Sequence, residues 1–180
     1  MLKKYLMSAM NDNIPVSLYA DKEDTENCMV GFIQGVTEEH VLVACFGTYG
    51  LYDGFTIKKC KDIFRLDSKD TYTEKVFKLY KFHEQKHPLI VRNSDNLVFD
   101  LLQHAKDNRL VVALVLCESD SDTCDAQGFI STIHDGMVTI EQVCRDGCND
   151  GACVVRLEDI STVYCDSDEQ MAVKILAENR

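Results

Sequence analysis

Four cations and two tyrosines lie close together in the first half of the chain and could contact a nucleic acid. These residues are Lys58, Lys59, Lys61, Arg65, Tyr49 and Tyr52. Cations bind phosphate groups and aromatic rings stack on bases, which is the combination that single-stranded nucleic acids require. The competing interpretation is a solvated strand face with the tyrosines in the core. The acidity of the whole chain, with a formal net charge of −11, favours that interpretation.

Three cysteines in the second half, Cys144, Cys148 and Cys153, are candidates for a metal or redox site. Thiolates are good zinc ligands, but a structural zinc site needs four ligands, and the spacing Cys-x3-Cys-x4-Cys is not a recognised one. Residues on successive strand positions also point to opposite faces. We therefore expect no metal and no cofactor, and we interpret most of the nine cysteines as reduced, small apolar side chains. A thiol or metal sensor in the second half is the alternative.

Signatures of catalysis are absent from the sequence. It contains no Gly-x-Ser-x-Gly, no glycine-rich phosphate loop and no His-Glu-x-x-His. We expect no catalytic residues and no enzyme. No apolar run approaches the roughly 18 residues of a membrane helix, and the first residues lack the apolar core of a signal peptide. These features predict a cytoplasmic protein without a membrane partner.

The charge is distributed unevenly along the chain. Residues 1–81 hold 11 Lys and Arg against 12 Asp and Glu, whereas residues 82–180 hold 8 against 18. Because affinity for nucleic acid comes largely from cations that meet phosphates, the second half is a poor surface for nucleic acid. The first half keeps that possibility.

The two halves align at an offset of 97 residues without a gap. Gly31-Phe32-Ile33 falls on Gly128-Phe129-Ile130, and further matches are Val41 with Val138, Gly50 with Gly147, Asp53-Gly54 with Asp150-Gly151, and Asp62-Ile63 with Asp159-Ile160. One offset that holds glycine, turn and apolar positions together indicates a duplication. We place repeat 1 at residues 1–81, a linker at 82–94 and repeat 2 at 95–180.

Each repeat is predicted to be a helix followed by five strands. In repeat 1 the helix spans residues 2–10, and the strands lie near 15–19, 29–36, 41–46, 55–66 and 73–79. In repeat 2 a helix capped by Ser94 or Asp95 precedes strands near 110–116, 127–133, 137–143, 152–164 and 170–176. Its apolar face comprises Leu97, Val98, Leu101, Leu102 and Ala105. Expected core residues are Phe32, Ile33, Val41, Val43, Ile57 and Ile63, with Phe129, Ile130, Val138, Ile140, Val154 and Ile160.

A glycine inside a strand often marks a sharp bend, and Gly31 and Gly128 both lie inside the second strand of their repeat. The predicted fold class is therefore mostly β, with two tandem small barrels of bent antiparallel strands. A helix, five strands, a central glycine in strand two and a short polar turn into strand three resemble the Sm/LSm fold. Residues 154–163, Val-Val-Arg-Leu-Glu-Asp-Ile-Ser-Thr-Val, resemble the fourth strand of the Hfq family of bacterial Sm-like RNA chaperones. SH3-like barrels are the main competitor.

The residues with which that family binds RNA are missing. Members that bind uridine-rich RNA carry Asp-x-x-Met-Asn after strand two, whereas residues 37–41 read Thr-Glu-Glu-His-Val and residues 134–138 read His-Asp-Gly-Met-Val. The chaperones place Tyr-Lys-His before Ile-Ser-Thr-Val, and this chain has Arg-Leu-Glu at residues 156–158. The RNA-binding role therefore cannot be transferred from the family.

The resemblance also implies a mode of assembly. In the family, strand four of one domain pairs with strand five of its neighbour. We expect strand 73–79 to dock on strand 152–164, or strand 55–66 on strand 170–176, and three chains to form a head-to-tail trimer that closes as a pseudo-hexameric ring. The leading hypothesis is a non-enzymatic Sm-like module that binds protein or its own copies through edge strands. The alternative is an RNA-binding regulator that uses the basic strand of repeat 1.

Overall fold

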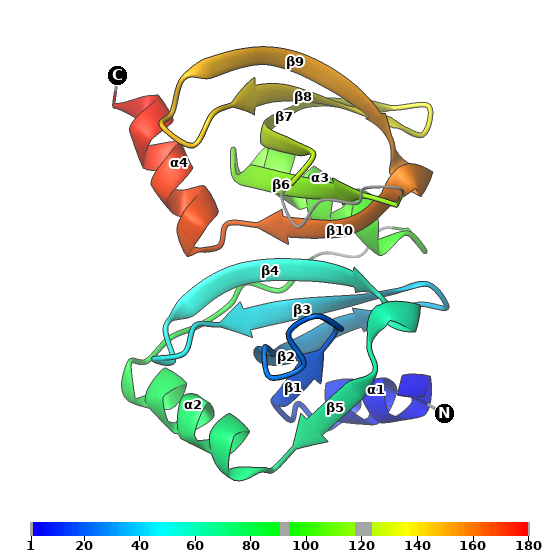
Figure 1. Ribbon diagram of the computed structural model, residues 1–180, viewed down its shortest axis with the longest axis vertical. Helices are drawn as coiled ribbons and strands as arrows, with labels where there is room; N and C mark the ends of the chain where they lie inside the picture. The colour runs from blue at the N-terminus through cyan, green and yellow to red at the C-terminus, as the bar shows by residue number, and fades with distance from the viewer. Residues whose placement is uncertain (1, 91–93, 118–123, 180) are drawn as a thin grey trace. The chain divides into compact units, whose positions relative to one another are not determined.

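A computed structural model describes residues 2–90, 94–117 and 124–179. The chain divides into two compact units, Met1–Leu89 and Ile90–Arg180. Both units contain the same elements in the same order: a helix, four strands, a 3-10 turn, a fifth strand and a second helix (Figure 1). The strand pairs within each unit are antiparallel. With five strands and two helices in each unit, the protein is mostly β.

Unit 1 is a five-stranded sheet with the strand order β5-β1-β2-β3-β4. Its elements are α1 (Leu2–Asn11), β1 (Val16–Tyr19), β2 (Met29–Val36), β3 (His40–Phe46), β4 (Tyr52–Lys59), the turn η1 (Cys60–Asp62), β5 (Arg65–Ser68) and α2 (Thr71–Phe82). Unit 2 has the order β10-β6-β7-β8-β9. Its elements are α3 (Leu97–Asp107), β6 (Val111–Leu116), β7 (Ala126–His134), β8 (Met137–Val143), β9 (Asn149–Arg156), the turn η2 (Leu157–Asp159), β10 (Ile160–Cys165) and α4 (Asp168–Glu178).

The central hairpins of the two units have the same register at the offset of 97 residues. The pairs Ile33↔Val43 and Gly35↔Leu42 flank a bulge in unit 1, and the pairs Ile130↔Ile140 and Thr132↔Thr139 flank the corresponding bulge in unit 2. The pairs between β3 and β4 and those between β8 and β9 also coincide, including their irregular step. Matched residues therefore lie on the same face of their sheets.

Gly31 and Gly128 let the backbones of this hairpin approach more closely than a side chain would permit. A Cβ atom at Gly31 would lie 2.2 Å from the carbonyl oxygen of Ala44, and one at Gly128 would lie 2.0 Å from that of Glu141. Both distances are far inside van der Waals contact, so only glycine fits. The sequence predicted a sharp bend at these two residues, and the close approach of the neighbouring backbone is the physical reason for glycine there.

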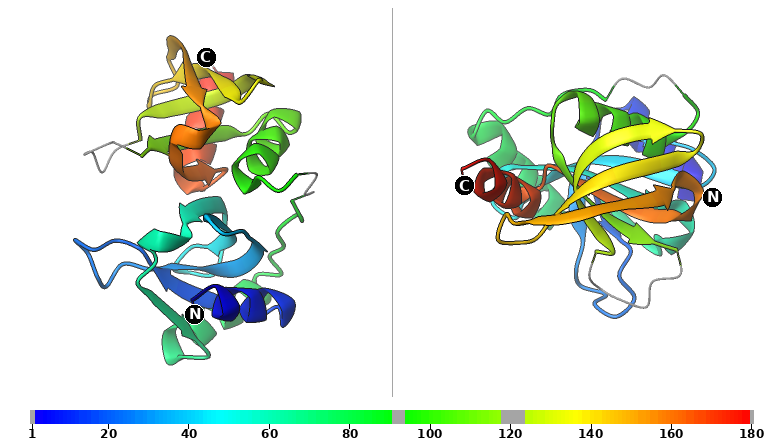
Figure 2. Two further views of the ribbon diagram at one scale, coloured as in Figure 1. Left: turned by 90° about the vertical axis from the view of Figure 1, so that its right-hand side faces the viewer. Right: turned by 90° about the horizontal axis from the view of Figure 1, so that it is seen from above.

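The core of unit 1 lies between α1 and one face of its sheet. Leu6 of α1 is fully buried against strand residues that include Val16, Leu18 and Val43. Figure 2 shows α1, in dark blue, lying along this sheet. In unit 2 the predicted apolar face of α3 is buried as expected, at Leu97, Val98, Leu101, Leu102 and Ala105. The cap of α3 is Asn96, whose side chain accepts from the Phe99 amide at 3.1 Å, rather than Ser94 or Asp95.

Most of the predicted core residues are buried, and three differ. Phe32 and Phe129 are half-buried. Val154 is 59% exposed, whereas its counterpart Ile57 is fully buried, so the prediction for Val154 was wrong. Val154 was assigned to the core because it matches Ile57 in the repeat, but matched strand positions are not buried to the same extent in the two units.

The segments 73–79 and 170–176 are helical, so their assignment as strands was wrong. The Asp70 side chain caps α2 by accepting from the amides of Tyr72 and Thr73, and the buried residues Thr73, Val76 and Tyr80 follow a helical spacing. The long strands 55–66 and 152–164 are each interrupted by a 3-10 turn, which creates the fifth strand of each unit. The predicted docking of 73–79 or 170–176 as strands is therefore ruled out.

The sheets also differ from the expected barrels. In the residues that the structure describes, no pair joins β5 to β4 or β10 to β9, so neither five-stranded sheet closes. Among the described helices, none combines the length and the apolar composition that crossing a membrane requires.

The close approach at the two glycines is testable by adding a single methyl group. We expect Gly31→Ala and Gly128→Ala each to lower the free energy of unfolding by about 1–3 kcal/mol, because the backbone must move to admit the Cβ atom. Gly47→Ala is the control, since a Cβ there would meet only the Leu51 carbonyl oxygen at 3.9 Å. Urea denaturation followed by circular dichroism measures the effect, and equal midpoints for all three variants would contradict the argument.

Candidate functional site

The two lysines of β4 do not form one cationic surface. Lys58 and Lys59 are successive strand residues and therefore point to opposite faces of the sheet. Lys58 lies near Asp21, whose pKa is lowered first by the backbone amides of Asp24 and Glu23 and then by this lysine. Lys58 is thus close enough to a carboxylate of its own unit to interact with it electrostatically.

Arg65 is engaged inside unit 1 as well. Its Nε donates to Asp67 Oδ1 at 3.0 Å and its Nη2 to Asp67 Oδ2 at 2.5 Å. The guanidinium carbon lies 4.4 Å from the centroid of the Tyr19 ring. Lys61 is exposed in the turn η1. A phosphate that approached Arg65 would have to compete with two charge-assisted hydrogen bonds.

The two tyrosines lie in different surroundings. Tyr49 is 75% exposed in the loop between β3 and β4. Tyr52 packs against other rings, with centroid distances of 4.5 Å to His87 and 6.2 Å to Phe55. The side chain of Tyr52 is therefore engaged in packing, and the six residues proposed for nucleic acid are not gathered on one surface.

Of the three candidate cysteines, two lie together and the third is separate. The Cys144 amide donates to the Cys148 carbonyl at 2.8 Å, across the neck of the loop between β8 and β9. Cys153 lies farther along β9, paired with Ile140. Within the described part of the chain, no group of three or more His, Cys, Asp or Glu side chains could hold a metal ion.

His87 occupies an aromatic cage that sequence reasoning did not identify. Its Nδ1 lies 2.9 Å from the Tyr80 hydroxyl, and its ring lies 5.6–5.8 Å from those of Phe46, Phe55 and Tyr80, besides the closer Tyr52. Burial lowers the pKa of His87 to about 4, and the nearby backbone of Cys45 and Gly54 offsets only part of that shift. His87 is therefore neutral near pH 7.

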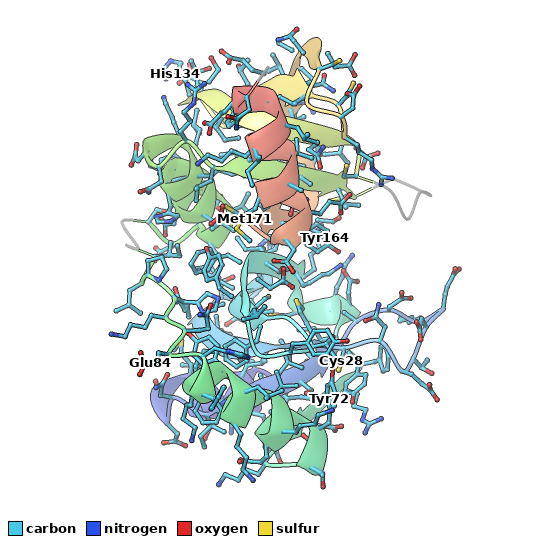
Figure 3. All side chains as sticks on the ribbon, turned by 90° about the vertical axis from the view of Figure 1, so that its left-hand side faces the viewer. Cys28, Tyr72, Glu84, His134, Tyr164 and Met171 are labelled. Carbon is cyan, nitrogen blue, oxygen red and sulfur yellow. The ribbon has the colours of Figure 1, made fainter. Side chains whose placement is uncertain are left out.

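The cage fixes the segment that follows α2, residues 83–89, which we call the strap. Figure 3 labels Glu84 where the chain leaves α2 and the strap begins. Gln34 Nε2 donates to the Pro88 carbonyl at 3.0 Å, and the Tyr52 amide donates to Gln85 Oε1 at 3.1 Å. The strap is thus tied to unit 1 by hydrogen bonds and ring packing.

The strand β9 presents the clearest candidate surface for association. Within the described residues it pairs with one strand, β8. Its middle reads Ala-Cys-Val-Val at residues 152–155, without a charge, and Val154 is largely exposed. Edge strands that carry apolar side chains and unpaired backbone groups are templates for strand addition unless a charge, a proline or a cover protects them.

The strand β5 of unit 1 also pairs with a single strand, β1, within the described residues. It has four residues and carries the ion pair of Arg65 with Asp67. Short length and charge are the usual protections of an edge. The edge at β9, with eight residues and an uncharged centre, lacks both.

No family model, curated protein or solved structure matches this chain. The functional assignment therefore depends on the geometry of its own residues. The uncharged run at 152–155 could have been identified from the sequence, because it stands out between Asp150 and Arg156. His87 carries no such signal, since it lies outside every periodic segment.

The burial of His87 in the cage predicts that the free energy of unfolding of unit 1 falls in acid. The folded pKa of His87 is below its unfolded value of about 6.5, so the unfolded chain binds the proton more readily and stability falls as the pH drops from about 6.5 toward 4. Allowing for partial exposure of the ring, we expect a loss of about 1–2 kcal/mol between pH 7 and pH 5. Urea denaturation at both pH values measures it.

The variant His87→Phe should reduce this loss of stability, because it removes the titrating group from the cage. A residual pH dependence will remain from His104, whose pKa is also lowered by burial. His83→Phe is the matched control, because His83 is exposed in the same strap. An equal loss of stability in His87→Phe and in the unchanged protein would contradict this role of His87.

Proposed function

We propose that this chain is a non-enzymatic assembly module built from two Sm-like domains. Support for the domain type comes from the helix, the five bent strands, the central glycine and the strand order β5-β1-β2-β3-β4, which recurs as β10-β6-β7-β8-β9. The identical register and bulges at an offset of 97 residues support a duplication as the origin of the two units.

The main support for this proposal is the edge strand β9, whose eight residues have an uncharged centre. Its backbone groups on the side away from β8 can pair with an added strand, and Ala152 and Val154 offer apolar side chains to cover. The occupant that we propose is β5 of a second copy, whose short length and ion pair disfavour pairing with another charged edge but leave its outer side open, within the described residues, to the uncharged β9. Sm-like domains join strand four of one domain to strand five of the next, and β9 and β5 are the fourth and fifth strands of their units.

Such pairing is head-to-tail, because the two edges differ. A heterologous contact of this kind closes into a ring when the rotation permits and otherwise continues as a filament. Three chains would place six domains in a ring. The acidic second half, with 8 Lys and Arg against 18 Asp and Glu, would meet the nearly neutral first half, which reduces like-charge repulsion between copies.

The test is a charge placed on the edge. We expect the unchanged protein to associate at high concentration in multi-angle light scattering, and Val154→Lys to lower the association constant by about tenfold or more, since a charge at an edge strand opposes pairing. Val154 is exposed, so the substitution should leave the unfolding midpoint nearly unchanged.

Thr132→Lys is the matched control. Thr132 pairs with Thr139, and Thr139 pairs with Val154, so all three residues share one row across the same face of the sheet. The control adds the same charge to that face but away from the edge, and we expect it to associate like the unchanged protein. A single-chain mass for the unchanged protein at every concentration would refute the proposal. Association that requires added single-stranded RNA would favour the RNA-binding alternative instead.

A further inference from the structure

The loop between β8 and β9 is closed at its neck by two cysteines. The Cys144 amide donates to the Cys148 carbonyl at 2.8 Å, and the Gly147 amide donates to the Cys144 carbonyl at 2.9 Å. Gly147 has a φ of +83°. These features describe a three-residue hairpin loop that ends in a glycine bulge. Facing residues in such a neck have Cα atoms roughly 5.5 Å apart, which is the separation that a disulfide spans.

Unit 1 forms the same loop without cysteines. The Gly47 amide donates to the Leu51 carbonyl at 2.9 Å, and the Gly50 amide donates to the Gly47 carbonyl at 2.8 Å. Gly50 has a φ of +73°, close to that of Gly147. The backbone therefore does not require thiols at these positions, and the cysteine pair is a property of unit 2 that the fold itself leaves unexplained.

The loop is seated against α4, so its neck has a defined position. A Cβ atom at Gly147 would lie 2.6 Å from the carbonyl carbon of Leu176, which shows how closely the loop approaches the helix. Arg145 Nε also lies 3.5 Å from Glu169 Oε1. Figure 1 shows the loop beside α4, drawn in red. A cross-link at the neck would join two backbones that are already held in place.

The two thiols are accessible and lie beside carboxylates. Both cysteines are partly exposed. Cys148 Sγ donates to Asp146 Oδ2 at 3.4 Å. Partial burial, together with the nearby Asp150, raises the pKa of the Cys144 thiol. Because the thiolate is the reactive form, exchange should be slow near pH 7 and faster as the pH rises.

We propose that Cys144 and Cys148 form a reversible disulfide across the loop neck by exchange with a low-molecular-weight disulfide such as oxidised glutathione. One cysteine thiolate attacks a sulfur of the reagent and releases one thiol, which leaves a mixed disulfide. The second cysteine then attacks the protein sulfur of that mixed disulfide and releases the second thiol. In sum the two cysteines lose two protons and two electrons, and the reagent takes them up and is reduced to two thiols. This site goes beyond the proposed assembly and needs no second copy.

The experiment uses the full chain, reduced, freed of reductant and incubated with oxidised glutathione at a mildly alkaline pH. Mass spectrometry should show the loss of two hydrogen atoms without a bound glutathione. Cleavage after Arg145 should yield peptides 110–145 and 146–156 joined through Cys144 and Cys148. We expect complete loss of this product in Cys144→Ser and in Cys148→Ser, and no change in Cys153→Ser.

Two further measurements test the pairing of Cys144 with Cys148 even where a serine variant folds poorly. In denaturant the pairing should lose its selectivity, because the loop neck no longer exists. In the background of Cys144→Ser with Cys148→Ser, the double substitution Gly47→Cys with Leu51→Cys should transfer the reaction to unit 1, where the backbone is the same and Gly47 has no positive φ. A stable glutathione adduct, a cross-link to Cys117 or Cys153, or no reaction in the unchanged protein would each overturn the proposal.

Discussion

The bend in each sheet depends on one close approach between neighbouring backbones. Gly31 and Gly128 lie where a carbonyl oxygen of the next strand occupies the space that a Cβ atom would need. The bulge that follows increases the local twist, so that the hairpin curves around its N-terminal helix. A shift of one residue would bring a bulky side chain to this point and would move the apolar row to the other face. The glycine therefore specifies both the curvature and the register.

On this shared backbone the two units carry different surfaces. Leu42 and Ile57 pair across β3 and β4 and are fully buried, whereas their counterparts Thr139 and Val154 are partly or largely exposed. The loop necks differ in the same manner, with Gly47 and Leu51 in unit 1 and two cysteines in unit 2. Since the backbone is matched, the functional differences between the units must come from side chains. The uncharged edge strand β9 and the facing cysteine pair are two such side-chain differences, and both lie in unit 2.

The sequence predicted the parts of the fold that depend on glycine, turns and apolar periodicity. The predicted strands 29–36 and 137–143 coincide with β2 and β8. The last segment of each unit was misassigned because a short run such as 73–79 is compatible with both periods. In unit 1 local hydrogen bonds favour the helix, since the Asp70 side chain accepts from the first free amides of α2. Closure of the sheets depends on long-range pairing, which periodicity does not encode.

The candidate site was less predictable, for a related reason. Burial of a strand residue depends on what lies beyond the edge of its sheet, and the pattern of the strand alone does not contain that information. The match of Val154 with Ile57 therefore suggested a core residue where the chain has an exposed edge. The cysteines show the same limit. Their types indicated thiol chemistry, but only the pairing of β8 with β9 separates Cys153 from the two residues that face each other across the neck. Residue type determines which reactions are possible, and register determines which residues can carry them out.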